Sequence, residues 1–364
     1  MPSMRVLIAP DKFAGTLTAV EATAAMAEGW LREKPDDELD LAPMSDGGPG
    51  FVDVLNESRG GRLVRVTVRG PFGDPVPGGI LLADETAYVE SAQACGIHLT
   101  RATRAELAST YGVGELVLAA IDAGASRIVV GLGGSGSNDG GAGFLAALGA
   151  YGDRRLDGGV AALDGVRKVE IAAARERIGD VELVAATDVD NQLTGLLGAT
   201  RNYGPQKGIS EVRLPMVDTI LSAFAGAVDR KARLQPGAGA AGGLGYGLLV
   251  LGATRESGIE LVADVVGLAD RAAKADLVLT GEGSFDFSSR SGKVPYGVAS
   301  IASEALRPCV AIAGQVQVGA REMRAIGVES AYSLVSLVGE ERAFGDPSGA
   351  VADLAARVAR TWSR

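Results

Sequence analysis

The sequence predicts an α/β protein: a parallel-sheet domain with a second, mixed-sheet α/β domain inserted into it. In residues 1–60 and 265–364, β-branched apolar runs alternate with helical segments, which is typical of a parallel sheet. Between them, residues 62–91 hold three apolar runs joined by short Gly/Pro turns, which favours antiparallel pairing. We therefore expect one discontinuous domain, 1–60 plus 265–364, and an inserted domain with glycine-rich loops, 61–264.

The first domain opens with a buried strand at residues 5–10, followed by an amphipathic helix. Thr18 and Glu21 have the spacing of a helix-capping box, and Pro35 follows the expected end of the helix. A second strand at 39–44 leads through a Ser-Asp-Gly-Gly turn into another helix. This strand–helix–strand–helix order is the start of a parallel sheet.

The inserted domain continues with a helix near residues 115–123 and strands at 127–133 and 181–189. After residue 264, strands and helices alternate again. Three further strands are expected there, at residues 275–283, 308–314 and 329–336. Because α/β proteins bind ligands at domain junctions and at the carboxyl ends of parallel strands, we expect the site in a cleft between the two domains.

The composition excludes several classes of partner. The net charge is −10, which argues against nucleic acid or an anionic membrane, because such surfaces need clustered Lys and Arg. The N-terminal apolar run is too short for a signal peptide, and no segment is long and apolar enough to span a bilayer. A cytoplasmic protein is therefore predicted. The oligomeric state, a homo-oligomer included, stays open.

The few cysteines and the single histidine limit the kinds of catalytic site that the sequence can form. Cys95 and Cys309 lie in apolar surroundings without CxxC spacing, which is typical of buried thiols in a reducing compartment. His98 is the single histidine of the chain, which disfavours Ser-His-Asp triads and His-rich metal sites. Catalysis must therefore rest on carboxylates, lysines, hydroxyls and backbone groups.

Residues 131–144, GLGGSGSNDGGAGF, are half glycine and follow an apolar strand. They contain the GxGxxG pattern of dinucleotide sites, but the acidic residue expected about twenty residues later falls in a loop. Glycine N–H groups before a helix bind phosphates of any kind. We favour phosphate binding over an NAD site and over a purely structural turn. The candidate contacts are Gly133, Gly134, Ser135, Asn138 and Asp139.

Further candidates follow the strand at 181–189. Alternation along an extended strand would place Asp188 and Asp190 on one side, where two carboxylates suit Mg²⁺ or one serves as a general base. A solvated turn with an Asx cap is the alternative. Lys207 occupies a tight turn, GPQKG. A second glycine-rich loop, 236–247, alone favours close helix packing, but two such loops in one chain are hard to explain by packing.

Charged residues also follow the strands of the first domain. They are Asp11, Lys12, Asp46, Glu282, Asp286, Arg290 and Lys293. The carboxyl ends of neighbouring parallel strands share one edge, so this grouping favours a site. No GxxxxGK[ST] P-loop occurs. Phosphate loops, carboxylates and lysines without a catalytic histidine are typical of phosphoryl transfer, with Mg²⁺ across the phosphates and an aspartate receiving the hydroxyl proton.

Nine motifs run in order over nearly the whole chain: APDKF, MSDGGPG, TYGVGEL, GLGGSGSNDGGAG, ATDVDN, GPQKG, PGAGAAGGLG, GEGSFD and GKVPYGVA. In these motifs the sequence resembles the glycerate kinase type-1 family of bacterial ATP-dependent glycerate kinases. The resemblance implies transfer of the ATP γ-phosphate to D-glycerate with Mg²⁺, with 2-phosphoglycerate favoured over 3-phosphoglycerate. It also implies a Rossmann-like domain with an inserted α/β domain.

The resemblance also implies site residues. The family motifs cover Asp11, Asp46, Gly47, Gly48, Ser135, Asn138, Asp139, Asp188, Asp190, Asn191, Gln206, Lys207, Glu282, Asp286 and Lys293. We interpret Asp46, Asp188, Asp190 and Lys293 as catalytic, Asp188 and Asp190 also as metal ligands, and the others as phosphate or substrate contacts.

Two positions depart from the family pattern. Ala14 stands where many relatives have Lys, and Ser288, near Arg290, stands where many have Gln. Both departures bear on which acid is bound rather than on the reaction class. Two other classes remain open: an NAD-dependent oxidoreductase, marked by a nicotinamide absorbance change, and a metabolite sensor, marked by tight binding without turnover.

Overall fold

The computed structural model describes residues 3–13, 15–286 and 292–363. The chain divides into two compact units. Unit 1 comprises Met1–Asp46, Asp53–Arg59 and Gly258–Arg364, and unit 2 comprises Gly47–Val52 and Gly60–Ser257. The predicted α/β class, with one parallel and one mixed sheet, is confirmed. The predicted domain boundaries stay a prediction, because a compact unit need not be a segment that folds alone.

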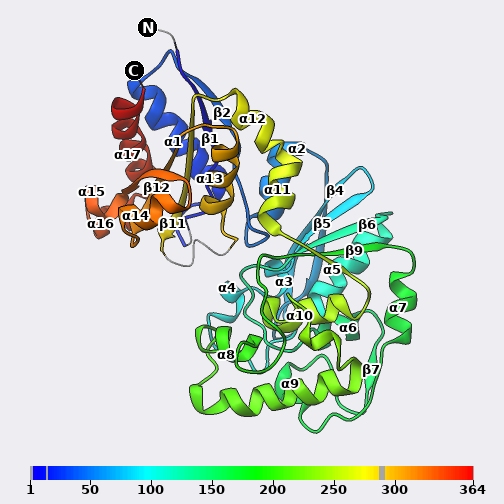
Figure 1. Ribbon diagram of the computed structural model, residues 1–364. Coiled ribbons are helices and arrows are strands. Elements are labelled where there is room, and N and C mark those ends of the chain that lie inside the picture. The colour runs from blue at the N-terminus through cyan, green and yellow to red at the C-terminus, as the bar shows by residue number, and fades with distance from the viewer. Residues whose placement is uncertain (1–2, 14, 287–291, 364) are drawn as a thin grey trace. The chain divides into compact units, whose positions relative to one another are not determined.

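Unit 1 is built on a five-stranded sheet in which all neighbours are parallel. The strand order is β13-β12-β11-β1-β2, so segments from both ends of the chain share one sheet (Figure 1). The strands are β1 (Arg5–Ile8), β2 (Glu38–Leu41), β11 (Leu277–Phe285), β12 (Cys309–Val316) and β13 (Val328–Ser333). Buried apolar side chains occupy most of β1 and the first parts of β11 and β12, at residues 277–279 and 309–313, as expected where helices cover both faces of a sheet.

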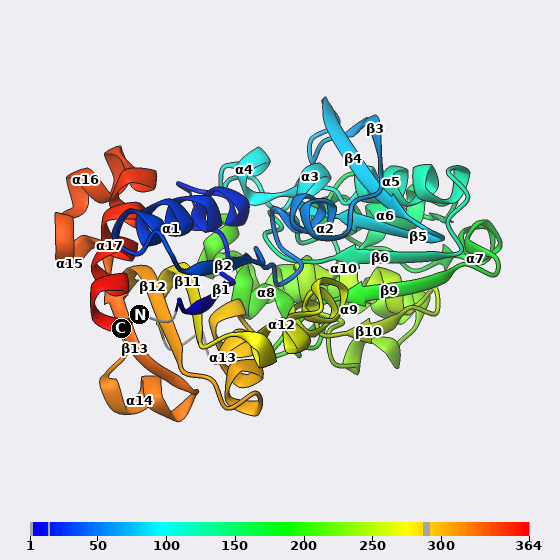
Figure 2. The ribbon, with the colours of Figure 1, turned by 90° about the horizontal axis from the view of Figure 1, so that it is seen from above.

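Helices cover both faces of this sheet (Figure 2). On one face lie α1 (Ala19–Glu33) and α17 (Pro347–Trp362), and on the other lie α12 (Leu268–Lys274) and α13 (Val294–Glu304). The remaining helices are α2 (Phe51–Arg59), α11 (Gly258–Val266), α14 (Ala320–Ala325), α15 (Leu334–Val338) and α16 (Glu340–Gly345). The predicted capping box begins α1, since the side chain of Thr18 accepts from Glu21 N–H and the Glu21 carboxylate accepts from Thr18 N–H.

Unit 2 contains a six-stranded mixed sheet with the order β10-β9-β6-β5-β4-β3. The strands are β3 (Arg62–Arg69), β4 (Pro75–Ala83), β5 (Thr86–Glu90), β6 (Arg127–Gly131), β9 (Glu182–Ala186) and β10 (Thr254–Glu256). The pairs β3–β4 and β4–β5 are antiparallel, as predicted, and the other pairs are parallel. The carboxyl ends of β3, β5, β6 and β9 therefore lie at one edge of the sheet.

Short helices and loops surround this sheet. The helices are α3 (Ala92–Cys95), α4 (Ile97–Thr100), α5 (Tyr111–Asp122), α6 (Ala142–Ala147), α7 (Ala172–Ile178), α8 (Ala199–Tyr203), α9 (Leu214–Val228) and α10 (Ala240–Leu249), with a small sheet of β7 (Tyr151–Gly152) and β8 (Val169–Glu170). The helix predicted near 115–123 is α5. No helix within 3–13, 15–286 and 292–363 has the length and apolar character needed to cross a membrane.

Candidate active site

The glycine-rich loop after β6 packs backbone to backbone on its neighbours. A Cβ at Gly133 would clash with Gly48 Cα, and one at Gly134, where φ is +72°, would lie 2.6 Å from Pro49 Cδ. Gly133 N–H also donates to Gly47 O at 3.1 Å. Packing on the 47–49 turn is therefore enough to require glycine at both positions, and Gly47 and Gly48 form the surface against which the loop packs.

The second glycine-rich loop, around α10, packs on the first. A Cβ at Gly242 would clash with Ser137 O, one at Gly243 would lie 2.5 Å from Gly140 Cα, and Gly140 N–H donates to Gly242 O at 3.0 Å. The expectation that two such loops are hard to explain by packing is therefore wrong, because each loop is the packing partner of the other.

We expect Gly133→Ala to lower the free energy of unfolding by about 1–3 kcal/mol, near the upper end of this range, because the backbone at Gly48 cannot move aside as a side chain can. The matched control is Gly226→Ala in α9, where a Cβ meets nothing within 4 Å and alanine favours the helix. Urea unfolding of both variants checks this. Equal stability of the two variants would contradict the packing role of Gly133.

Asp139 is fully buried and ties the loop to the start of α5. Its Oδ2 accepts from Thr110 N–H at 2.8 Å and Thr110 Oγ1 at 2.9 Å, and its carboxylate also accepts from Gly141 N–H and Gly143 N–H. Burial raises the pKa of this carboxyl, although the hydrogen bonds oppose the shift. With its oxygens used in this way, Asp139 fixes the loop and caps α6 rather than pointing at a ligand. Thr110, its partner, was missed; its signal was its place in the TYGVGEL motif.

Lys207, the last residue of the 3-10 helix Pro205–Lys207, lies buried against the glycine-rich loop. Its Nζ donates to Ser135 Oγ at 2.9 Å and to Ser137 O at 2.7 Å, and the residue is only 3% exposed. Burial lowers the pKa of Lys207 to about 8, against smaller opposing effects of Cys95 and Asp139. Among the residues that the structure describes, no carboxylate lies within ion-pair distance of Nζ. The buried ammonium group therefore lacks a counter-ion within residues 3–13, 15–286 and 292–363.

Unpaired polar groups lie on the same loop. Within the described part of the chain, the N–H groups of Gly134 and Ser135 donate to no protein acceptor, and Ser137 Oγ and Asn138 Oδ1 are buried without a partner. The other side of the Asn138 amide is used, since Nδ2 donates to Thr200 Oγ1 at 2.9 Å. Buried polar groups are nearly always hydrogen-bonded, so the loop has donors and acceptors available for a ligand or for water.

The structure gives Asp188 and Asp190 different surroundings. Because β9 ends at Ala186, both lie in irregular backbone, so strand alternation does not apply to them and their common side stays a prediction. Asp188 Oδ1 accepts from Ser257 Oγ at 2.6 Å, whereas Asp190 is 76% exposed and pairs with Arg255 at 2.7 Å. Ser257 and Arg255 were missed, because their positions 65 or more residues along the chain carry no local signal.

Two further candidates of unit 2 lie near this segment in the sequence. Asn191 Oδ1 accepts from Tyr203 OH at 2.8 Å, and its Nδ2 donates to Leu197 O at 2.7 Å, so both ends of its amide are used within the protein. Gln206 is exposed, although the next residue in its short 3-10 helix, Lys207, is buried. Asn191 therefore has a local structural role, and Gln206 is accessible to a ligand.

In unit 1, Lys12 joins two carboxylates at the carboxyl edge of the parallel sheet. Its Nζ lies 3.3 Å from Asp11 Oδ1 and 3.5 Å from Asp46 Oδ1. Burial raises the pKa of Asp11 to about 6, with Lys12 opposing and Asp46 adding to the shift. Burial alone would lower the pKa of Lys12, but the two carboxylates outweigh it and raise the pKa.

A second charged group lies along β11. Glu282 is buried within the strand, Asp286 directly follows it, and Lys293 Nζ lies 3.8 Å from Glu282 Oε2 and 4.0 Å from Asp286 Oδ1. Asp11 N–H donates to Gly281 O, so β1 brings the first cluster beside this one. Arg290, Ala14 and Ser288 lie outside the described residues.

The carboxylates of unit 1 fit a metal site in which the protein supplies only some of the ligands, and a bound phosphate and water supply the others. In 3–13, 15–286 and 292–363, no three His, Cys, Asp or Glu side chains gather closely enough to hold a metal. Mg²⁺ typically takes one or two carboxylates and completes its shell with substrate phosphates and water. Asp11 and Asp46, held by one lysine, offer such a pair of hard oxygen ligands.

Comparison with known proteins identifies the family of this chain. The model of the glycerate kinase family matches residues 6–363. The glycerate kinase of Bacillus subtilis (strain 168) is 38% identical over 91% of this chain and 90% of the relative, and the glycerate 2-kinase of Escherichia coli (strain K12) is 36% identical over 92% of each. A crystal structure of a "putative glycerate kinase 2" from Salmonella typhimurium LT2 superposes with a TM-score of 0.80 at 35% identity, covering 99% of this chain and 98% of that one. The resemblance inferred from the motifs is confirmed: this chain belongs to the glycerate kinase family and is a kinase.

Proposed function

We propose that this kinase transfers the γ-phosphoryl group of ATP to D-glycerate, forms 2-phosphoglycerate and uses Mg²⁺. The observation that carries the proposal is the buried ammonium group of Lys207, which has no counter-ion among the described residues. An unpaired buried charge is costly, so we assign a phosphate of ATP as its counter-ion. The position of transfer rests on the E. coli relative, which is named a glycerate 2-kinase.

The glycine-rich loop then acts as the phosphate cradle. The free N–H groups of Gly134 and Ser135 donate to phosphate oxygens, and Lys207 supplies the positive charge. Asp139 and the 47–49 turn hold the loop in this geometry before the nucleotide arrives. Donors that are fixed in advance stabilise the charge of the transferring phosphoryl group without reorganising during the reaction.

Asp188 is our candidate for the group that accepts the proton of the glycerate hydroxyl. It is half-buried at the carboxyl edge of the sheet, and the hydroxyl of Ser257 orients one of its oxygens. A base must be held within hydrogen-bond reach of the proton that it removes, which such an anchor provides. Asp190, exposed and paired with Arg255, is assigned to structure.

Asp11 and Asp46 would hold Mg²⁺, which when bound neutralises phosphate charge and orients the transferring group. Lys12 keeps the two carboxylates together and limits their mutual repulsion. Lys293 does the same for Glu282 and Asp286, which we assign to the contacts with substrate or metal-bound water.

The proposal is tested by ADP release in a coupled assay with Mg-ATP and a panel of acceptors. We expect turnover with D-glycerate, less with L-glycerate and lactate, and none with glycerol, which lacks the carboxylate. Omission of Mg²⁺ should abolish turnover. Folded protein that releases no ADP with any hydroxy acid would refute the proposed function.

The pH profile should report Lys207. Its lowered pKa, about 8, means that the ammonium form is present below pH 8 and is lost as the pH rises above it. Cys95, whose thiol has its own pKa raised by burial to about 12, and Asp139 are the titratable groups that affect it, and Asp139 is fixed by Thr110. We expect kcat/KM for ATP, which reports the free enzyme, to fall above about pH 8. A flat profile to pH 9.5 would contradict this role.

A further inference from the structure

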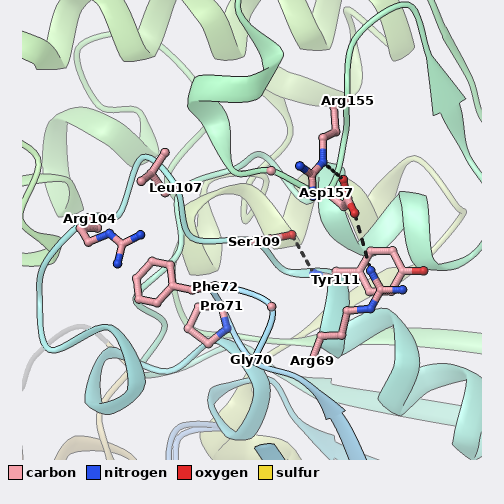
Figure 3. A pocket seen from close by; sticks show the side chains of 12 residues that line it. Arg69, Gly70, Pro71, Phe72, Arg104, Leu107, Ser109, Tyr111, Arg155 and Asp157 are labelled. Atoms are coloured by element: carbon pink, nitrogen blue, oxygen red, sulfur yellow. Dashed lines mark hydrogen bonds and ion pairs between the residues drawn. The ribbon is translucent and has the colours of Figure 1, made fainter. Parts of the chain in front are cut away.

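Unit 2 has a pocket of about 200 Å³ near the end of β3 (Figure 3). Its walls are the turn between β3 and β4, the segment 104–111 and the loop 155–158. The charged lining residues are three arginines, Arg69, Arg104 and Arg155, and one carboxylate, Asp157. The lining is therefore net positive, although the chain as a whole has a net charge of −10.

Two of these arginines already have partners. Arg69 lies over the Tyr111 ring, 3.8 Å from its centroid, with the Glu115 carboxylate 3.4 Å and the Asp157 carboxylate 3.6 Å from its nitrogens. Arg155 Nε donates to Asp157 Oδ1 at 2.6 Å. These contacts fix the guanidinium groups and the carboxylate at the wall, as the dashed lines of Figure 3 show for Asp157.

Arg104 is different. Its guanidinium lies over the Phe72 ring, 4.6 Å from the centroid, and among the residues that the structure describes it has no ion pair or hydrogen bond. Stacking uses the face of the guanidinium and leaves the N–H groups at its edge for another partner. That planar edge matches a carboxylate or a phosphate, which it can bind through two parallel hydrogen bonds.

The backbone that presents Arg104 is strained. Arg101, Ala102 and Arg104 have φ values of +54°, +52° and +55°, in the left-handed region that residues with a Cβ rarely adopt. The segment is held in place beyond them, where Glu106 forms an ion pair with Arg213 and Glu106 O accepts from Ala161 N–H. Such strain persists only where the surroundings impose it, and it is concentrated at binding and catalytic sites.

We propose that this pocket binds a small organic acid or phosphate ester through Arg104. Its volume is below the roughly 300–1,000 Å³ of pockets for drug-sized ligands, so the occupant is smaller than a nucleotide. The pocket is also connected to the glycine-rich loop, because a residue between two of its lining residues donates hydrogen bonds to that loop. Ser109 and Tyr111 line it, and Thr110 between them donates to Asp139. An occupant therefore contacts the segment that fixes the glycine-rich loop.

Titration calorimetry of the full chain, without ATP or Mg²⁺, tests the proposal with three probes: D-glycerate, inorganic phosphate and 2-phosphoglycerate. We expect at least one probe to bind at a site, separate from any binding at the kinase site, that Arg104→Gln weakens at least tenfold. Arg104→Lys, which keeps the charge but loses the planar fork, should weaken it by an intermediate factor. The matched control is Arg101→Gln, because Arg101 is exposed, has the same left-handed φ and does not line the pocket.

Comparing the probes shows whether carboxylate or phosphate is recognised, and thermal melting shows that the variants are folded. The absence of binding by all three probes to the wild-type chain would overturn the proposal, as would equal weakening by Arg104→Gln and Arg101→Gln. The kinase assay is separate: Arg104-dependent binding in a chain without turnover supports this site and refutes the proposed function.

Discussion

Lys207→Met is expected to lower kcat/KM for ATP by about 100- to 1,000-fold, the range measured when a positioned donor to a transition-state charge is removed. The ammonium group is buried against Ser135 and Ser137 without a carboxylate partner among the described residues. Methionine has nearly the same length but no charge. Steady-state kinetics over a range of ATP concentrations provides the measurement.

Stability separates a binding role for Lys207 from a structural one. Removing a buried charge that lacks a counter-ion relieves its desolvation cost, which offsets the hydrogen bonds lost from Ser135 and Ser137, so the melting temperature of Lys207→Met should stay near that of wild type. If Lys207 only held the loop, the variant would melt lower and lose activity in proportion. Lys231→Met, at an exposed position, is the control for loss of one positive charge and should behave as wild type.

Asp188→Asn should lower kcat by about a hundredfold or more, the scale of losing a general base, while leaving the KM for ATP within a few-fold of wild type. The amide oxygen can still accept the hydrogen bond from Ser257, so this contact is kept while the basicity of the carboxylate is lost. Single-turnover measurements distinguish a slower chemical step from slower product release.

Asp190→Asn is the matched control for this prediction. The residue lies two positions away, but its carboxylate is 76% exposed and pairs with Arg255. Exposed ion pairs contribute little, so we expect near-wild-type turnover and a stability change of less than about 1 kcal/mol. Equal loss of activity in both variants would restore the paired-carboxylate interpretation; no loss in either would assign both to structure.

The fold was predictable because its signals are local. The capping box at Thr18 and Glu21, the β-branched strands and the closely spaced runs in 62–91 each depend on neighbours in sequence, and each is present in the structure. Strand ends were less predictable. β9 ends at Ala186 although the expected strand continues to Val189, because the pairing with β6 ends there.

The candidate site was predictable only in part, because its contacts join distant segments. The sequence indicates a crowded backbone in each glycine-rich loop, but not that Gly242 packs on Ser137. Nor does it reveal that Asp139 accepts hydrogen bonds from Thr110, or that Ser257 donates a hydrogen bond to Asp188. A glycine needed for packing and a glycine needed for phosphate look the same in a single sequence, and only the spatial neighbours distinguish them.

The proposed reaction is phosphoryl transfer from ATP to the hydroxyl at carbon 2 of D-glycerate. A ³¹P NMR spectrum of the wild-type protein with Mg-ATP and D-glycerate tests it most directly, because it reports turnover and the phosphorylated position together. We expect loss of the γ-phosphate signal with the appearance of ADP and 2-phosphoglycerate resonances. An unchanged ATP spectrum with folded protein would contradict the kinase assignment to this acid, and a 3-phosphoglycerate resonance would contradict the assigned position.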